Sequence, residues 1–183
     1  DVFFEMVASM DGGVPLAVMT YYNLVLRGGV ERFVSRCADT GISGIIVPDL
    51  PIEEASELRG ACMEHDVGYV SFVAPTTTPE RLELAIEGCT GFLYIVSRLG
   101  TTGVGGGVSA RIESLLNQMR GVPVPKAVGF GISTPEQAER LISLGADGVV
   151  VGSHFVRLAG QGRLDEIERE ARAIKEGCVR GKG

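Results

Sequence analysis

The sequence predicts a parallel α/β fold, on the evidence of its apolar runs, the helical stretches between them and an internal repeat. Six short runs rich in β-branched residues start about 22 to 33 residues apart, the length of one βα unit. The runs are almost wholly apolar, as strands covered on both faces should be. They occupy residues 14–20, 43–47, 69–73, 91–97, 124–129 and 147–151.

A stretch with helical periodicity follows each predicted strand. The pairs Thr78-Pro79 and Thr134-Pro135 place a hydroxyl near the helix cap and proline in the first turn. The predicted helices span residues 30–40, 52–65, 79–87, 110–119, 134–144 and 164–175. Glycine marks the helix ends at Gly41, Gly88, Gly121 and Gly145.

An internal repeat favours a (β/α)8 barrel over other parallel folds. Residues 41–47 match residues 145–151 at an offset of 104 residues, which holds four βα units. A barrel built from two similar halves explains equivalent strands four units apart, whereas a doubly wound sheet does not. A generic helix-to-strand turn is the plainer alternative.

The predicted barrel is incomplete, because six strands are present and such a barrel usually needs about 250 residues. The chain opens at Asp1 with an amphipathic stretch typical of a helix leading into a strand, and no Met precedes it. We therefore expect one partial domain over residues 1–183, corresponding to units 3 to 8, with about two N-terminal βα units missing. The open sheet edges should make this part poorly stable alone.

Composition and charge argue against several classes of protein. No apolar run approaches the ~20 residues needed to cross a bilayer, and no secretory signal opens the chain. The net charge of −6 and the absence of a basic block disfavour nucleic acid as a partner. We expect a cytoplasmic protein whose cysteines are reduced packing residues, since no C-x-x-C pair suggests zinc or a disulfide framework. The cysteines are Cys37, Cys62, Cys89 and Cys178.

Two turns late in the chain predict a phosphate site. Segments 129–133 and 151–156 each end a strand in glycine and open a helix with serine. Phosphate commonly lies at the loops after the last two strands of such barrels, held by main-chain N–H groups and the helix dipole. No cation is required, and Lys126 should point away from this end. Ordinary βα turns, also rich in Gly and Ser, are the alternative.

Other segments are candidates for a functional role, and each also has a purely structural interpretation. Loop 98–107 holds five glycines and is predicted to close over a substrate, unless it is a linker without a role. Asp49, between two prolines, either faces a ligand or partner or caps the following helix. Tyr94 and Tyr21 either border an apolar pocket or fill the core. His65 and His154 lack a second ligand at metal spacing, so we interpret both as structural.

With these segments in place, the chain resembles the α subunit of tryptophan synthase over nearly its whole length. The pairing of Val-Pro-Asp-Leu-Pro with Ser-Arg-x-Gly-x-Thr-Gly, in this order, is specific, whereas the glycine turns are shared with many barrels. The matching segments are residues 19–23, 46–51, 73–77, 94–98, 102–103, 128–133 and 151–153.

The resemblance implies an enzyme, a carbon–carbon lyase that cleaves indole-3-glycerol phosphate to indole and glyceraldehyde 3-phosphate in tryptophan biosynthesis. The indole passes to a β subunit that carries pyridoxal phosphate, so this subunit itself needs no cofactor and no metal. Carried over by position, the phosphate-binding residues are Gly103, Gly131, Gly152 and Ser153. Tyr94 and Phe130 belong to the substrate site, and Tyr21, Asn23 and Asp49 lie near the subunit boundary or site entrance.

The chain departs from the family where catalysis is concerned. The resemblance assigns proton transfer to a Glu on the second strand and an Asp in the loop after it, and neither segment is present. We therefore name no catalytic residue and expect this chain alone to be inactive. The alternative is a non-catalytic barrel that binds a phosphate ester and acts through a partner. A phosphoribosyl isomerase barrel would need paired Asp residues at opposite strand ends, which are absent.

Overall fold

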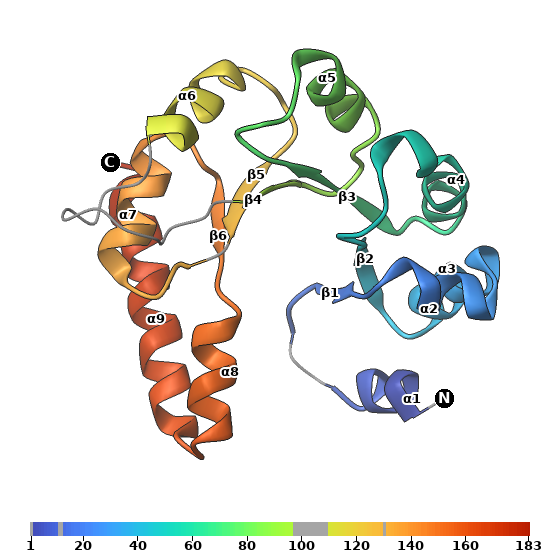
Figure 1. The fold of residues 1–183 in the computed structure, drawn as a ribbon. Helices are drawn as coiled ribbons and strands as arrows, with labels where there is room; N and C mark the ends of the chain where they lie inside the picture. Colours follow the sequence, from blue (N-terminus) through green and yellow to red (C-terminus); the bar gives the residue numbers. More distant parts are fainter. Residues whose placement is uncertain (1, 11–12, 97–109, 130) are drawn as a thin grey trace. The chain divides into compact units, whose positions relative to one another are not determined.

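The computed structural model describes residues 2–10, 13–96, 110–129 and 131–183. Its six strands fall on the predicted runs, and their order in the sheet is that of the chain, β1-β2-β3-β4-β5-β6 (Figure 1). The pairs β1–β2, β2–β3 and β5–β6 are parallel, as predicted. The strands are β1 (Leu16–Met19), β2 (Ile42–Ile46), β3 (Gly68–Val73), β4 (Leu93–Val96), β5 (Lys126–Gly129) and β6 (Gly148–Val150).

Helices separate the strands, and three of them differ from the prediction. The short α2 was not predicted, because seven residues are too few for a periodic pattern. The expected helix over 52–65 is broken at Ala55 into a 3-10 turn and α4. The last helix continues to Gly181. The helices are α1 (Val2–Ala8), α2 (Tyr22–Gly28), α3 (Val30–Asp39), η1 (Ile52–Glu54), α4 (Ser56–Glu64), α5 (Pro79–Glu87), α6 (Ala110–Gln118), α7 (Pro135–Ser143), α8 (Ser153–Gly160) and α9 (Leu164–Gly181).

Proline explains why two strands begin later than predicted. β1 begins at Leu16 and β5 at Lys126, each directly after a proline. Proline has no N–H to donate to a neighbouring strand, so Pro15 and Pro125 lie just outside the ladder.

The chain consists of two compact units. Unit 1 comprises Asp1–Phe72 and Thr78–Leu93, and unit 2 comprises Val73–Thr77 and Tyr94–Gly183. The core of unit 1 includes three fully buried side chains from α3, β2 and α4, namely Val34, Ile45 and Leu58. Unit 2 buries Ile95, Val128 and Leu141 from β4, β5 and α7 just as completely.

Within unit 2, α9 packs against both α7 and α8 (Figure 1). Glycine permits the contact with α7, because a Cβ at Gly177 would lie 2.3 Å from the carbonyl oxygen of Pro135. A Cβ at Gly181 would lie 2.5 Å from the carbonyl oxygen of Glu139. Arg180 adds an ion pair with Glu139, with Nε 2.8 Å from Oε2. Larger residues at these glycines would push the two helices apart.

Lys126 and Asp147 join β5 to β6 at their amino ends. The main-chain N–H of Lys126 donates to Oδ2 of Asp147 over 2.8 Å, and Nζ lies 3.1 Å from the same oxygen. Nζ also donates to the carbonyl oxygens of Val122 and Val124 over 3.3 Å. Lys126 therefore points away from the carboxyl ends of the strands, as the sequence led us to expect.

Acid should weaken unit 2 through Asp147. Partial burial raises the pKa of this carboxyl group, but the hydrogen bonds from Lys126 outweigh it and hold the pKa below 3.8. The carboxylate thus stabilises the fold fully above that pH, and the contribution is lost as the pH falls through the lower folded-state pKa. In denaturant titrations from about pH 5 to about pH 2, the wild type should lose more free energy of unfolding than Asp147→Asn. Equal losses in the two proteins would contradict this role.

Candidate functional site

The two predicted phosphate turns follow β5 and β6, and both lie in unit 2. Gly129 ends β5, and Gly131 has a φ of 78°, a left-handed conformation that favours glycine. Ser153 is the first residue of α8, and Gly152 is its N-cap. The structure therefore places Gly131, Gly152 and Ser153 just after the carboxyl ends of the neighbouring, paired strands β5 and β6.

The turn before α7 satisfies three of its own N–H groups, those of Ser133, Thr134 and Gln137. Oε1 of Gln137 accepts hydrogen bonds from the N–H of Ser133 over 2.8 Å and of Thr134 over 3.1 Å. In return, Oγ1 of Thr134 accepts from the N–H of Gln137 over 3.3 Å. This capping box leaves the start of α7 with fewer free donors for an anion. Its sequence signature, Thr-x-x-Gln, was readable and was missed.

The turn before α8 is open instead. No side chain caps it, and the N–H groups of Ser153, His154 and Phe155 have no hydrogen-bond partner among the described residues. Gly152 and Ser153 are exposed, and a Cβ built at Gly152 meets nothing within 4 Å. Uncapped N–H groups at a helix start, with the positive end of the helix dipole, bind anions such as phosphate.

Tyr94 lies against the end of β5. Its side chain is buried, and a Cβ at Gly129 would come within 2.2 Å of its hydroxyl oxygen. Burial raises the pKa of the Tyr94 phenol, so the ring stays neutral at physiological pH. The structure thus brings the tyrosine expected in the substrate site to the strand that leads into the first phosphate turn. Gly129 was not recognised as its contact.

The remaining predicted residues are divided between unit 1 and the part of the chain outside the described residues. Gly103, Phe130 and loop 98–107 are not among the described residues. Tyr21, which is 63% exposed, and the exposed Asn23 lie at the start of α2. Asp49 follows β2 and accepts the N–H of Tyr22 at both carboxylate oxygens, over 2.9 and 3.2 Å. It caps α2, not the helix that follows it, because parallel pairing brings the loops after β1 and β2 together.

Each histidine contacts a glutamate, and two of the cysteines are buried in the core. Nε2 of His65 lies 2.5 Å from Oε1 of Glu31 on α3, and His154 contacts Glu170 on α9. Burial raises the pKa of Cys37 and Cys62 to about 12, so both thiols stay protonated. Across the described ranges, no three His, Cys, Asp or Glu side chains are grouped to hold a metal ion. Membrane-spanning helices were sought in the same described residues, and none of their helices is long and apolar enough to cross a bilayer.

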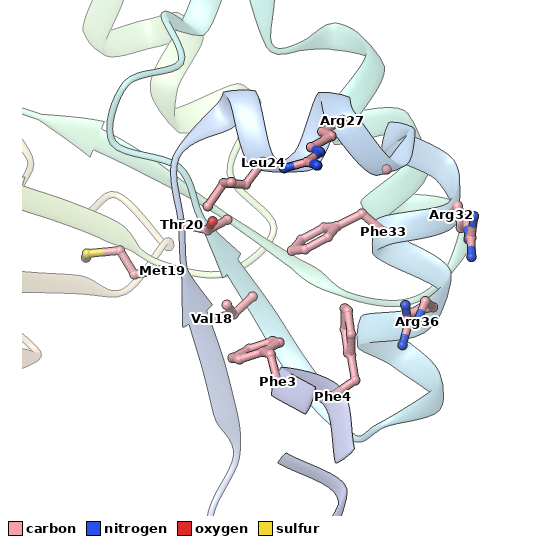
Figure 2. A pocket seen from close by; sticks show the side chains of 11 residues that line it. Phe3, Phe4, Val18, Met19, Thr20, Leu24, Arg27, Arg32, Phe33 and Arg36 are labelled. Carbon is pink, nitrogen blue, oxygen red and sulfur yellow. The ribbon is translucent and has the colours of Figure 1, made fainter. Parts of the chain in front are cut away.

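A groove of about 810 Å³ lies on unit 1 beside β1. Figure 2 shows Phe3, Phe4 and Phe33 gathered on its apolar side. The rings of Phe4 and Phe33 meet edge to face at 5.9 Å, and the guanidinium of Arg36 lies 4.2 Å from the Phe4 centroid. The other charged residues that line the groove are Arg27 and Arg32. Among the described residues that line this groove there is no carboxylate, thiol or imidazole, and none of the residues predicted for the substrate site.

Comparisons with known proteins agree on one family. The family model for the tryptophan synthase alpha chain matches residues 1–181. The alpha chain of Methanosarcina barkeri is 47% identical over 180 residues, which are 97% of this chain and 68% of that relative. That of Natronomonas pharaonis is 46% identical, over 98% of this chain and 70% of that relative.

Solved structures give the same result. The alpha subunit from Campylobacter jejuni has a TM-score of 0.84 at 32% identity, with 94% of this chain and 70% of that chain covered. The tryptophan synthase α2β2 complex from Pyrococcus furiosus has a TM-score of 0.84 at 34% identity, with 96% and 72% covered. The chain therefore spans about two thirds of the length of these relatives.

Gly129→Ala should destabilise unit 2, because its Cβ would overlap the Tyr94 ring and displace it from the end of β5. We expect a loss of about 1 to 3 kcal/mol in the free energy of unfolding, measured by denaturant titration. Gly148→Ala in the neighbouring strand is the matched control, since a Cβ there meets nothing within 4 Å. A similar loss in both variants would show that replacing any glycine in these strands is destabilising, and that the contact with Tyr94 is not the cause.

Proposed function

We propose that this chain, which belongs to the tryptophan synthase alpha chain family, binds indole-3-glycerol phosphate and takes part in its retro-aldol cleavage to indole and glyceraldehyde 3-phosphate. The observation that carries the proposal is the open first turn of α8, directly after β6, in a chain whose family model matches residues 1–181.

In this proposal the phosphate is held by main-chain N–H groups of Gly103, Gly131, Gly152 and Ser153, with the Ser153 hydroxyl added. The exposure of Gly152 and Ser153 supports it, as does the absence of a side-chain cap on α8. Neither nearby cation is needed. Lys126 is bonded at the amino end of β5, and Arg157 lies 3.0 Å from a ring nitrogen of His154.

The rest of the substrate lies, on this proposal, against Tyr94 and Phe130, with the indole beside Phe130. Carbon–carbon cleavage needs an acid for the indole ring carbon and bases for the ring nitrogen and the glycerol hydroxyl. The family resemblance assigns these tasks to a Glu and an Asp in segments that these 183 residues do not include. The chain thus supplies substrate binding and not proton transfer.

We further propose that the partner is a tryptophan synthase β subunit that carries the pyridoxal phosphate, in a cytoplasmic heterotetramer. The similarity to the α2β2 complex from Pyrococcus furiosus supports such a partner. Tyr21, Asn23 and Asp49 are the residues proposed for the subunit boundary or site entrance. Their position in the loops after β1 and β2, with Tyr21 63% exposed, is compatible with that role.

The domain itself is proposed to be part of an eight-unit barrel, with about two βα units on the amino-terminal side of Asp1. Apolar surface beside both outer strands supports this. The groove beside β1 leaves Phe3 39% and Leu24 53% exposed. A hollow of about 490 Å³ runs along β6 and α9. Strand addition would cover both surfaces.

The purified 183-residue chain should not cleave indole-3-glycerol phosphate, whereas the protein extended by its upstream coding sequence should. Indole release can be followed directly, with a protein-free blank as the control. Turnover by the 183-residue chain would place the catalytic carboxylates within it. Phosphate-ester binding without turnover by the extended protein would favour the non-catalytic alternative.

Gly152→Val in the extended protein should fold normally and bind substrate far more weakly. The backbone at Gly152 has a φ of −117°, outside the left-handed region, and a Cβ there meets nothing within 4 Å. The valine side chain would therefore compete with the proposed anion for the same open space. Ser153→Ala should be milder, since it removes one hydrogen bond to a charged group, worth about 1.5 to 3 kcal/mol. Michaelis constants and thermal melts should be measured together. An unchanged constant for Gly152→Val, with a strong increase for Lys126→Ala, would locate the phosphate elsewhere.

A further inference from the structure

His154, the second residue of α8, has both ring nitrogens engaged. Nε2 contacts the Oε2 atom of Glu170 on α9, and Nδ1 lies 3.0 Å from Nη2 of Arg157, one turn along α8. The side chains of His154 and Glu170 are only 13% and 29% exposed. In contrast, the Arg172–Glu168 pair on the same helix is 70% and 79% exposed. Shielding from water makes the histidine contact the stronger restraint of the two.

The two partners determine the protonation of the ring. A guanidinium offers only donors, so Nδ1 must accept from Arg157, and a carboxylate offers only acceptors, so Nε2 must donate to Glu170. Both conditions hold for a neutral imidazole with its hydrogen on Nε2. Arg157, His154 and Glu170 then form a chain of hydrogen bonds with no net charge, and the ring cannot rotate without breaking one of them.

This chain of bonds acts on the first turn of α8. Gly152 gives the helix no side-chain cap, and a helix start without a cap is free to fray. Glu170 is held on a firm support, because α9 is packed against α7 through Gly177 and Gly181. The bond from His154 to Glu170 therefore ties the turn that contains Ser153 to the rest of unit 2.

We propose that His154 is a positioning residue for the phosphate turn. Its side chain holds the N–H groups of the first turn of α8 at the orientation in which they converge on the anion, and the imidazole does not touch the anion itself. The inference rests on the phosphate site proposed above. Main-chain donors cannot reorient by side-chain rotation, so a small tilt of α8 lowers their affinity for phosphate.

A double-mutant cycle on the full-length protein tests the inference, with calorimetric titration of inorganic phosphate and glycerol 3-phosphate. H154L and E170L should each weaken binding of both probes about tenfold, the order expected for one lost hydrogen bond to a charged group. The double variant should be no weaker than either single variant, because both remove the same restraint. H154Q retains a donor and an acceptor and should restore most of the affinity.

E168L is the matched control, since it removes one carboxylate from an exposed pair on the same helix and should leave binding unchanged. If H154L fails to fold, E170L tests the same contact, because it removes the partner of His154 on α9. Wild-type phosphate affinity in folded H154L or E170L would overturn the positioning role, even if the melting temperature fell. G152V separates the two proposals. If it also binds phosphate normally, the site itself is wrong and the inference falls with it.

Discussion

The close contact between α7 and α9 is the constraint on which the candidate site depends. Gly177 and Gly181 let the backbone of α9 approach the carbonyl groups of α7 at distances that any Cβ would prevent. The same helix contacts α8, so it supports both of the helices that follow β5 and β6. A site made of main-chain N–H groups needs such a support, because its donors are only as well placed as the helices that carry them.

Main-chain donors also suit the charge of this protein. The chain has a formal net charge of −6, and two cations close to the last strands are engaged elsewhere. Lys126 is bonded to Asp147 at the amino ends of the strands, and Arg157 is bonded to His154. Peptide dipoles bind a phosphate ester locally without giving the surface a positive field that would attract polyanions.

The strands and most helices were predictable because they depend on local signals, namely apolar runs, proline and glycine. The strand order followed from the barrel that the internal repeat favours. The glycine turn that opens α8 was predictable from the same local signals. Partners distant in sequence were not. Asp49 caps a helix 27 residues earlier, and Glu170 meets His154 across 16 residues. No local pattern specifies such pairs, since they exist only after the strands have paired and α9 has packed. Gln137 was different, because its capping signature lies within one turn of helix.

The bond between Asp49 and the N–H of Tyr22 joins the loop after β2 to the helix after β1. A partner that recruits this carboxylate withdraws the acceptor from the first turn of α2. Thermodynamic reciprocity requires that the cap weaken the partner's binding by the same free energy by which the partner weakens the cap. Binding of such a partner at Asp49 would therefore increase fraying of α2, and a firmer cap on α2 would weaken the binding by the same free energy.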